Sequence, residues 1–331
     1  MRLRPVASFI SAALTSIALA ACGGHSSSSS GTPSQPSGSQ DPDSRADTLL
    51  AKMTQAQKIQ LVAGGAVSDP NLNIAFPRGG GGYVPGIPAL GISAPYIADG
   101  SVGVGNAVGP ATALPSSVAS AATWDTSLAQ QYGQVIGTEL ADYGMNVNLG
   151  GNTNLIGREP RDGRTFETKG EDPILAGKIA AAHLLGVQSQ HIIAQAKHFS
   201  FNDQETGRFT ANAIIDDRAG RESDLLAFEI AVKDAGVQSV MCSYNLTNGT
   251  YGCENPYLLT KVLKGDWKFP GFVMSDWLAT HSAVAAANAG LDQEQPDQVW
   301  FSQLPAAIQN GQVQQSRLDD MVHRILRAMF A

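Results

Sequence analysis

Short apolar runs alternate with amphipathic segments from about Asp47 to the end of the chain. The apolar runs have the length and the flanking turn residues that are typical of buried strands. Between them, apolar residues recur every three or four positions, which is the spacing of a helix with one buried face. The pattern predicts repeated strand–helix units with parallel strands. We expect strands at residues 95–98, 145–149, 192–196, 238–241 and 272–275.

Several helices have recognisable starting residues. Asp125 is placed to cap a helix that carries Leu128, Tyr132, Val135, Ile136 and Leu140 on one face. Asp172 and Pro173 open another helix, with the proline at its first position. We expect the last helix to start at Ser316, where Asp319 completes a capping-box pattern.

The fold expected from this alternation is α/β, as a (β/α)8 TIM-type barrel with room for irregularity, over residues 46–331. A dinucleotide-binding sheet would need a glycine fingerprint directly after the first strand. Gly79 to Gly82 and Gly103 to Gly105 lack that context, and we expect both stretches to be flexible loops.

The first 45 residues differ from the rest. Arg2 and Arg4 precede an apolar stretch that is too short to cross a bilayer, so residues 1–21 are expected to be a signal peptide. The stretch ends in a sequence that resembles a bacterial lipoprotein signal, with lipidation at Cys22. An ordinary secretory signal is the alternative. Residues 22–45 are rich in Ser, Gly and Pro and are expected to form a flexible linker.

Cysteine usage agrees with export. The sequence has 3 cysteines, and if Cys22 carries a lipid, Cys242 and Cys253 remain. In an oxidising compartment this pair is expected to form a disulfide, with two buried thiols as the alternative. The expected location is the periplasm or the outer membrane. The net charge of −7 argues against binding to nucleic acid.

Polar residues follow the predicted strands at equivalent positions. Asp99 follows the first strand, Lys197 and His198 a middle one, Tyr244 the next, and Asp276 the last. Since parallel strands in a barrel end on one face, these side chains are expected to share a pocket. Each also has a structural explanation, such as a turn, a core histidine, a surface lysine or a packed tyrosine.

Asp276 is the most informative of these residues. A carboxylate at the end of a buried strand needs water, a cation or a substrate to stabilise its charge. The alternative is that Asp276 caps a helix over residues 277–280.

The pocket chemistry suits a polyhydroxylated ligand. Asp276 is placed to attack an anomeric carbon, and Trp277 offers a flat apolar face to a sugar ring. The charges of Lys197 and Arg164 are expected to keep Asp276 ionised. The residues that offer donors and acceptors to sugar hydroxyls are Asp99, Arg164, Lys197 and His198.

An ordered series of motifs resembles family 3 of the glycoside hydrolases, in the N-terminal barrel domain of the β-glucosidase and β-xylosidase type. The resemblance covers roughly Ala46 to Ala331. The matching stretches are Ile97–Gly100, Pro160–Glu167, Gly170–Pro173, Ala196–Phe199, Asn202–Arg208, Met241–Asn245, Asn248–Gly249 and Val273–Trp277.

The resemblance implies a role for each of these side chains. Asp276 matches the nucleophile of a retaining hydrolase, and Trp277 matches the residue that stacks on the sugar. Arg208 and Tyr244 match positions that orient the nucleophile or line its pocket. The residues that match those holding the first sugar are Asp99, Arg164, Lys197 and His198.

The sequence departs from the family pattern at a few positions, namely Ser101, Asp162, Gln293 and Gln295. The general acid/base is also not evident. A retaining enzyme needs a second carboxyl group ~5–5.5 Å from the nucleophile, and in multi-domain members it comes from a second domain. Glu171 and Glu205 carry carboxyl groups, but nothing in the sequence places either of them at the leaving group. We therefore expect the general acid/base to come from an absent C-terminal domain or a second polypeptide.

The sequence thus predicts an exported, lipid-anchored enzyme that hydrolyses terminal β-glucosyl or related residues of small carbohydrates. The alternatives are a non-catalytic sugar-binding lipoprotein and, less favoured, a barrel without a site. Nothing in the sequence calls for a metal or an organic cofactor, since hydrolysis of this type needs only carboxyl groups and water.

Overall fold

The computed structural model describes residues 41–65, 80–106, 109–156 and 159–331. The expected signal peptide at 1–21, the lipidation site at Cys22 and most of the 22–45 linker lie outside these residues. The first described helix, α1, begins at Pro42, within the expected linker. Among the described residues, no helix has the length and apolar character needed to cross a membrane.

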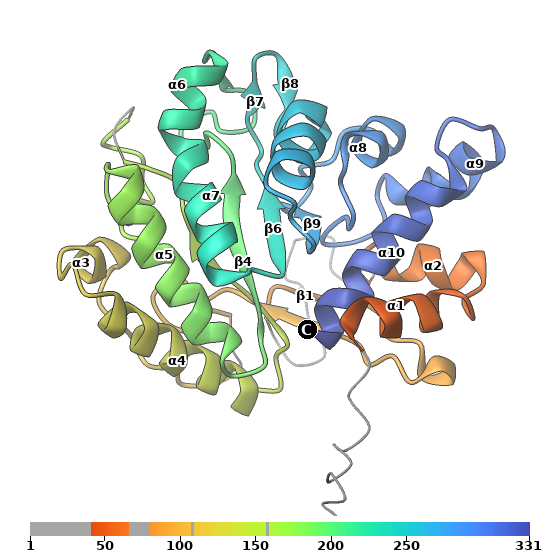
Figure 1. Ribbon diagram of the computed structural model, residues 1–331, viewed down its shortest axis with the longest axis horizontal. Helices are drawn as coiled ribbons and strands as arrows, with labels where there is room; N and C mark the ends of the chain where they lie inside the picture. The colour runs from red at the N-terminus through yellow and green to blue at the C-terminus, as the bar shows by residue number, and fades with distance from the viewer. Residues whose placement is uncertain (1–40, 66–79, 107–108, 157–158) are drawn as a thin grey trace, which may run out of the picture. The chain divides into compact units, whose positions relative to one another are not determined.

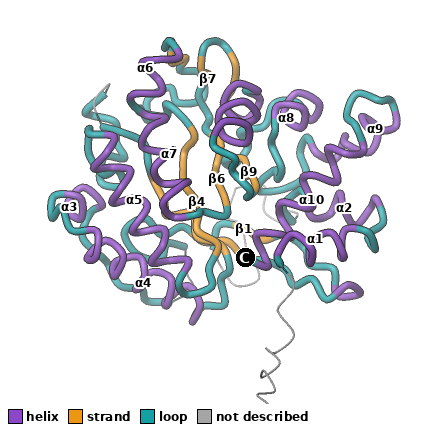
Figure 2. Tube along the Cα trace, viewed as in Figure 1, coloured by secondary structure: helices purple, strands orange, loops and turns teal. Residues whose placement is uncertain are grey.

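Strands and helices alternate through the described chain (Figures 1 and 2), which confirms the α/β class. The strands are β1 Gly82–Tyr83, β2 Tyr96–Ala98, β3 Val147–Asn152, β4 Ile193–Phe199, β5 Asn212–Ala213, β6 Ser239–Cys242, β7 Leu246–Thr247, β8 Thr250–Tyr251 and β9 Phe272–Ser275. The α-helices are α1 Pro42–Leu50, α2 Gln55–Leu61, α3 Ser117–Ala121, α4 Thr126–Asp142, α5 Pro173–Gln188, α6 Asp217–Glu222, α7 Asp224–Ala235, α8 Ala283–Ala289, α9 Leu304–Gln309 and α10 Gln315–Phe330. Short 3-10 helices cover η1 Pro88–Leu90, η2 Gly252–Glu254 and η4 Phe301–Gln303, and a π-helix covers η3 Tyr257–Asp266.

The main sheet contains six strands in the order β1-β2-β3-β4-β6-β9. β1 is antiparallel to β2, and all the other neighbours are parallel. Helices α4, α5 and α7 lie side by side on the outside of β3 and β4 (Figure 1). The crossover helices therefore allow successive parallel strands to end on the same face.

Two further segments continue the sheet beyond β9. The backbone of Gln293 pairs with β9, where Ser275 N donates to Gln293 O at 2.9 Å. Glu294 N donates to Val62 O at 2.9 Å, and Gly64 N donates to Glu294 O at 2.9 Å. Gly65 N then donates to Tyr83 O in β1 at 2.9 Å. Backbone hydrogen bonds thus connect β9 to β1 around the curled sheet.

The expected helix caps are largely present. Asp125 accepts from Ser127 N and Leu128 N at the start of α4, and Asp172 accepts from Leu175 N at the start of α5. The expected capping box at Ser316 is wrong. Helix α10 begins at Gln315 without a side-chain cap, and Asp319 instead forms an ion pair of 2.6 Å with Lys58.

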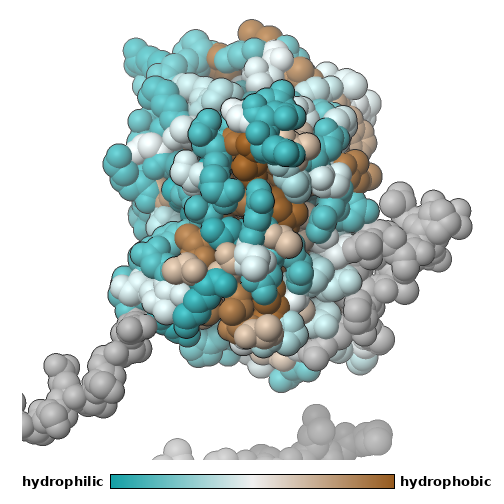
Figure 3. Space-filling view, turned by 90° about the vertical axis from the view of Figure 1, so that its right-hand side faces the viewer, coloured by the Kyte–Doolittle hydropathy of each residue, from teal (hydrophilic) through white to brown (hydrophobic). Residues whose placement is uncertain are grey.

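The first and last described helices pack against each other. The Arg45 guanidinium lies 3.9 Å from the centre of the Phe330 ring, and Arg327 forms an ion pair with Asp43 at 3.2 Å. Figure 3 shows the molecule from the right-hand side of Figure 1, where hydrophobic side chains appear in patches between hydrophilic ones. The apolar face of α10 is buried in the core, through Leu318, Met321, Val322, Ile325 and Leu326.

The expected strands all occur, with shifts of at most three residues at their ends and none for the strand at 272–275. The glycine stretch at 79–82 was expected to be a loop, but Gly82 belongs to β1. The cause is not local, because Gly82 is paired with Ile97 of β2, a partner that the glycine run itself does not reveal.

Candidate active site

Asp276 follows β9 at the end of the sheet where the parallel strands terminate. Its N–H donates to Cys242 O at 3.3 Å, and its Oδ1 accepts from Trp277 N at 2.7 Å. The next helix, α8, starts only at Ala283 and is capped by Ser282. The alternative in which Asp276 caps a helix over residues 277–280 is therefore wrong.

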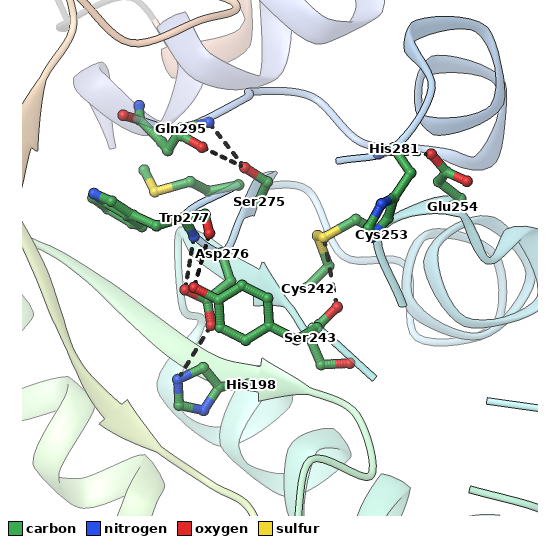
Figure 4. The surroundings of a disulfide bond; sticks show 12 residues. His198, Cys242, Ser243, Cys253, Glu254, Ser275, Asp276, Trp277, His281 and Gln295 are labelled. Carbon is green, nitrogen blue, oxygen red and sulfur yellow. Dashed lines mark hydrogen bonds and ion pairs between the residues drawn. A yellow bond between two sulfur atoms is a disulfide. The ribbon is translucent and has the colours of Figure 1, made fainter. Parts of the chain in front are cut away.

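The second carboxylate oxygen of Asp276 faces the imidazole of His198 (Figure 4). Oδ2 lies 3.7 Å from His198 Nε2 and has no hydrogen-bond partner among the described residues. Arg164 Nη1 lies 3.3 Å from the same ring nitrogen. Since an arginine can only donate, Nε2 accepts, and the ring proton is on Nδ1, 3.3 Å from Asn154 Oδ1.

Two opposing effects act on the pKa of Asp276. The side chain is 10% exposed, and burial raises its pKa above the ordinary carboxyl value. The charges of Lys197 and Arg164 lower this pKa, as expected, but they do not fully offset the loss of water. The two charges therefore act in the predicted direction, by favouring the ionised form of Asp276, while burial acts against them.

His198 is neutral in this environment. Burial lowers its pKa well below the ordinary value, and the charges of Arg164, Lys197 and Arg208 lower it further. A neutral ring keeps Nε2 as an acceptor, which agrees with the contact from Arg164.

Lys197 and Asp99 meet at the edge of the site. Lys197 Nζ lies 3.2 Å from Asp99 Oδ1, and Asn106 Nδ2 donates to Asp99 Oδ2 at 3.0 Å. The lysine side chain is 4% exposed, whereas that of Asp99 is 46% exposed. Asp99 therefore presents a carboxylate to solvent while a buried ammonium group fixes its position.

Tyr244, Arg208 and Trp277 form the other wall of the site. The Tyr244 hydroxyl donates to Trp277 O at 2.9 Å, and the Arg208 guanidinium lies 4.6 Å from the centre of the Tyr244 ring. The Trp277 indole donates through Nε1 to Gly81 O at 3.0 Å. These contacts fix the indole and the phenol next to Asp276.

The expected disulfide joins Cys242 and Cys253, with both cysteines buried (Figure 4). It closes the segment that contains Tyr244. The same segment contacts the loop after Asp276, because the rings of Tyr251 and His281 stack with centres 3.8 Å apart. The disulfide thus restrains the backbone beside the site.

The structure brings the eight sequence-predicted site residues into one connected cluster, while their roles stay predictions. Sequence reasoning missed Asn152, Asn154 and Glu167. Glu167 Oε2 accepts from Arg164 Nη2 at 2.7 Å and from Asn152 Nδ2 at 3.3 Å. Asn154 Oδ1 accepts from His198 N at 2.7 Å. The polar run 152–154 at the end of β3 had the same strand-end signal as the residues that were predicted.

The other carboxylates and the unusual residues also have defined places. Glu205 forms an ion pair with Arg208 at 2.8 Å, and Glu171 is exposed just before α5. Asp162 Oδ2 accepts from Arg164 N at 3.2 Å. Ser101 is buried, as are Gln293 and Gln295, whose side chains bond each other at 3.2 Å. These contacts leave the cluster around Asp276 intact.

This arrangement offers a carboxylate oxygen without a hydrogen bond, a neutral imidazole and two cationic groups around one position. Such a set can bind hydroxyl groups and hold a carboxylate ready to attack an electrophilic carbon. Among the described residues, no group of three or more His, Cys, Asp or Glu side chains is arranged to hold a metal ion.

Comparisons with known proteins agree with this geometry. The chain is 38% identical over 302 residues to β-glucosidase cel3A of Pyricularia oryzae, covering 86% of this chain and 39% of that protein. It is 37% identical over 307 residues to β-glucosidase 1 of Aspergillus aculeatus, covering 86% and 34%. The chain therefore spans well under half the length of these relatives.

Solved structures give the same result. The structure of β-glucosidase 3B from Thermotoga neapolitana in complex with α-D-glucose has a TM-score of 0.80 and 34% identity, covering 86% of this chain and 42% of that chain. DesR, a β-glucosidase from Streptomyces venezuelae solved with D-glucose, has a TM-score of 0.79 and 38% identity, covering 86% and 37%. The sequence model of the glycosyl hydrolase family 3 N terminal domain matches residues 88–328. The chain belongs to glycosyl hydrolase family 3, and the matched region is the N terminal domain of that family.

Proposed function

We propose that this chain carries the nucleophilic half of a retaining β-glucosidase, with Asp276 as the nucleophile. The observation that carries the proposal is the Asp276 carboxylate, which has one oxygen fixed by Trp277 N and the other unbonded beside His198 and Arg164. Attack of that oxygen on the anomeric carbon breaks the glycosidic bond, releases the protonated leaving group and gives a covalent glycosyl ester, which water then hydrolyses to the free sugar and the carboxylate. Both β-glucosidase structures named above were solved with glucose.

The sugar-binding residues follow from the same geometry. Asp99, Lys197, Arg164 and His198 offer acceptors and donors around Asp276, and Trp277 offers an aromatic face. The hydrogen bonds that close the sheet support a ring of the (β/α)8 type, in which Gln293–Gln295 and Val62–Gly65 complete the barrel and β1 is its antiparallel member. In such a barrel the site lies at the end where catalytic residues converge.

The leaving group needs a proton donor that we assign to polypeptide outside this chain. Glu205 is paired with Arg208, and Glu171 is exposed before α5, so neither is assigned to the leaving group. This chain covers 39% of the cel3A relative, which leaves room in such proteins for the required carboxyl group. A second domain or a second polypeptide would supply it here.

We also propose that the protein is exported and anchored by a lipid on Cys22, in the periplasm or on the outer membrane. The support is the sequence of residues 1–45 alone. Labelling of cells with a fatty acid analogue should mark the protein, and Cys22→Ser should abolish that label. Equal labelling of the variant would contradict the anchor.

The catalytic proposal is tested by intact mass after incubation with a 2-deoxy-2-fluoro glucoside that carries a good leaving group. Such a leaving group needs little protonation, so the first step can proceed without a general acid. We expect a mass gain of one fluoroglucosyl unit on the peptide that contains Asp276, and none in Asp276→Ala. Absence of an adduct in a folded wild-type protein would overturn the proposal, and labelling of the alanine variant would overturn the assignment of Asp276.

A further inference from the structure

Lys169 is a buried cation that the function described so far does not use. Among the described residues its side chain is one of the largest to be fully buried, with 1% of the residue exposed. A buried ammonium group is costly unless it is bound. Its Nζ donates to the backbone oxygen of Asn152 at 2.6 Å, at the end of β3.

Asn152 is the junction of two hydrogen-bonded routes toward the site. Its Nδ2 donates to Glu167 Oε2 at 3.3 Å, and its Oδ1 accepts from Asn154 N at 3.0 Å. Its backbone is paired with Lys197 in β4. The position of the Asn152 backbone therefore affects both side-chain contacts.

Both routes end at His198. Along the first, Glu167 holds Arg164 at 2.7 Å, and Arg164 contacts His198 Nε2 at 3.3 Å. Along the second, Asn154 Oδ1 accepts from His198 N at 2.7 Å, and Asn154 Nδ2 donates to His198 O at 3.0 Å. The imidazole that faces Asp276 is thus fixed from two sides by groups that meet at Asn152.

The charge on Lys169 is also sensitive to pH. Burial lowers its pKa to about 8, with a further lowering from Lys197 and an opposing effect from Glu167. On the α5 side lies His183, whose own pKa is lowered to about 3 by burial and by Lys169, so that this histidine stays neutral. Deprotonation above pH 8 removes the charge that strengthens the bond to Asn152.

We propose that Lys169 is a positioning residue, whose ammonium group holds the Asn152 backbone and through it aligns Arg164 and His198 with the sugar bound at Asp276. The inference rests on the proposed function, because the alignment matters for transfer of the sugar to Asp276. Lys169 itself is not in contact with Asp276 or with any residue assigned to the sugar. Its charge is the only direct influence that it has on them.

The test is the rate of fluoroglucosyl adduct formation as a function of pH in wild type, Lys169→Met and a control. The control is Lys264→Met. Lys264 is also buried, with its pKa lowered to about 8, but it bonds Gly290 O and Asp292 at 2.7 Å, two residues outside the contacts that join Lys169 to His198. Thermal unfolding of all three proteins reports the loss of stability separately.

For wild type, we expect the rate constant to fall as the pH rises through about 8. Lys169→Met should be slower by about 10- to 100-fold at pH 6, the scale expected when a reacting geometry is disturbed, and should lack the alkaline fall. Lys264→Met should keep both the rate and the fall despite a lower unfolding temperature. A wild-type rate and pH profile in Lys169→Met would overturn the inference.

Two further measurements keep the test decisive. If Lys169→Met does not fold, Lys169→Arg is the second variant. Its guanidinium group stays charged at every pH, so the alkaline fall in the rate should disappear. A persistent fall near pH 8 would contradict the proposal. If the wild type forms no adduct, the proposed function fails, and the ring ¹⁵N signals of His198 decide the matter without catalysis. They should shift near pH 8 in wild type and not in Lys169→Met, and identical titrations would overturn the role of Lys169.

Discussion

His198 Nε2 and Asp276 Oδ2 lie 3.7 Å apart without a hydrogen bond between them. The imidazole has no proton on this nitrogen, because Arg164 already donates toward it. The carboxylate oxygen is therefore placed beside the ring but keeps its lone pairs. This relationship explains how a buried acid can be rigidly positioned and still be available for attack.

The ionisation of Asp276 should control the acidic side of the pH profile. Burial raises its pKa above 3.8, and Lys197 is the largest influence that lowers it. Because only the carboxylate attacks, adduct formation should rise with pH through a midpoint above 3.8, and Lys197→Met should move that midpoint to higher pH. Lys178→Met, which removes a surface ion pair with Asp234, is the control. An unmoved midpoint in Lys197→Met would contradict this account.

The Tyr244 hydroxyl should matter more for the reaction than for stability. Tyr244→Phe removes the hydrogen bond to Trp277 O, which is worth about 1 kcal/mol in unfolding free energy. Because the bond positions the backbone next to Asp276, we expect adduct formation to slow by about 10-fold. Tyr257→Phe removes a hydroxyl from a surface network with Arg221 and should leave the rate unchanged. Equal rates in both variants would argue against a positioning role for Tyr244.

The disulfide should contribute to stability. Cys242 and Cys253 are separated by 11 positions, and closing a loop of that size stabilises a fold by about 3 kcal/mol on the chain-entropy model. The double variant Cys242→Ala/Cys253→Ala should therefore have a lower unfolding free energy in urea. Treatment with a reductant should lower the stability of the wild type and leave the variant unaffected. Equal stability of the two proteins would show that the cross-link is energetically neutral.

Glu294 should make stability depend on pH. Its carboxylate accepts from Trp300 N and Phe301 N, and burial raises its pKa from 4.5 to about 7. Between these values the folded protein holds a proton that the unfolded chain releases, so the unfolding free energy should fall as the pH rises, by at most about 3 kcal/mol. Glu294→Gln should remove that part of the slope. A difference between the two proteins that does not change from pH 4.5 to 7 would contradict the assignment.

The sequence predicted the strands and their polar ends well, because both depend on local pattern. The run 272–275 is apolar and ends in Asp276, and the structure places β9 at Phe272–Ser275. The helix-capping residues and the helical spacing of apolar residues also located α4 and α5. It failed at α10, where Asp319 has an ion pair with Lys58, a residue far away in the sequence. Local pattern carries no information about such a partner.

The residues that support the site were harder to predict for the same reason. Lys169 looks like a surface lysine in the sequence, and only the packing of β3, α5 and its own loop buries it. The motifs predicted the effect of the Lys197 and Arg164 charges on Asp276, whereas the rise of its pKa on burial depends on the whole fold.

The sheet is closed by segments from opposite parts of the chain. Gln293 Nε2 donates to Leu61 O across 232 positions of sequence, beside the backbone bonds between Glu294 and Val62. Forming such a contact has a high cost in loop-closure entropy, and the contact can form only when both segments are available. During synthesis, the α1–α2 segment must therefore wait, with its apolar residues uncovered, until the last strands have been made. We expect this segment to need protection from aggregation during synthesis.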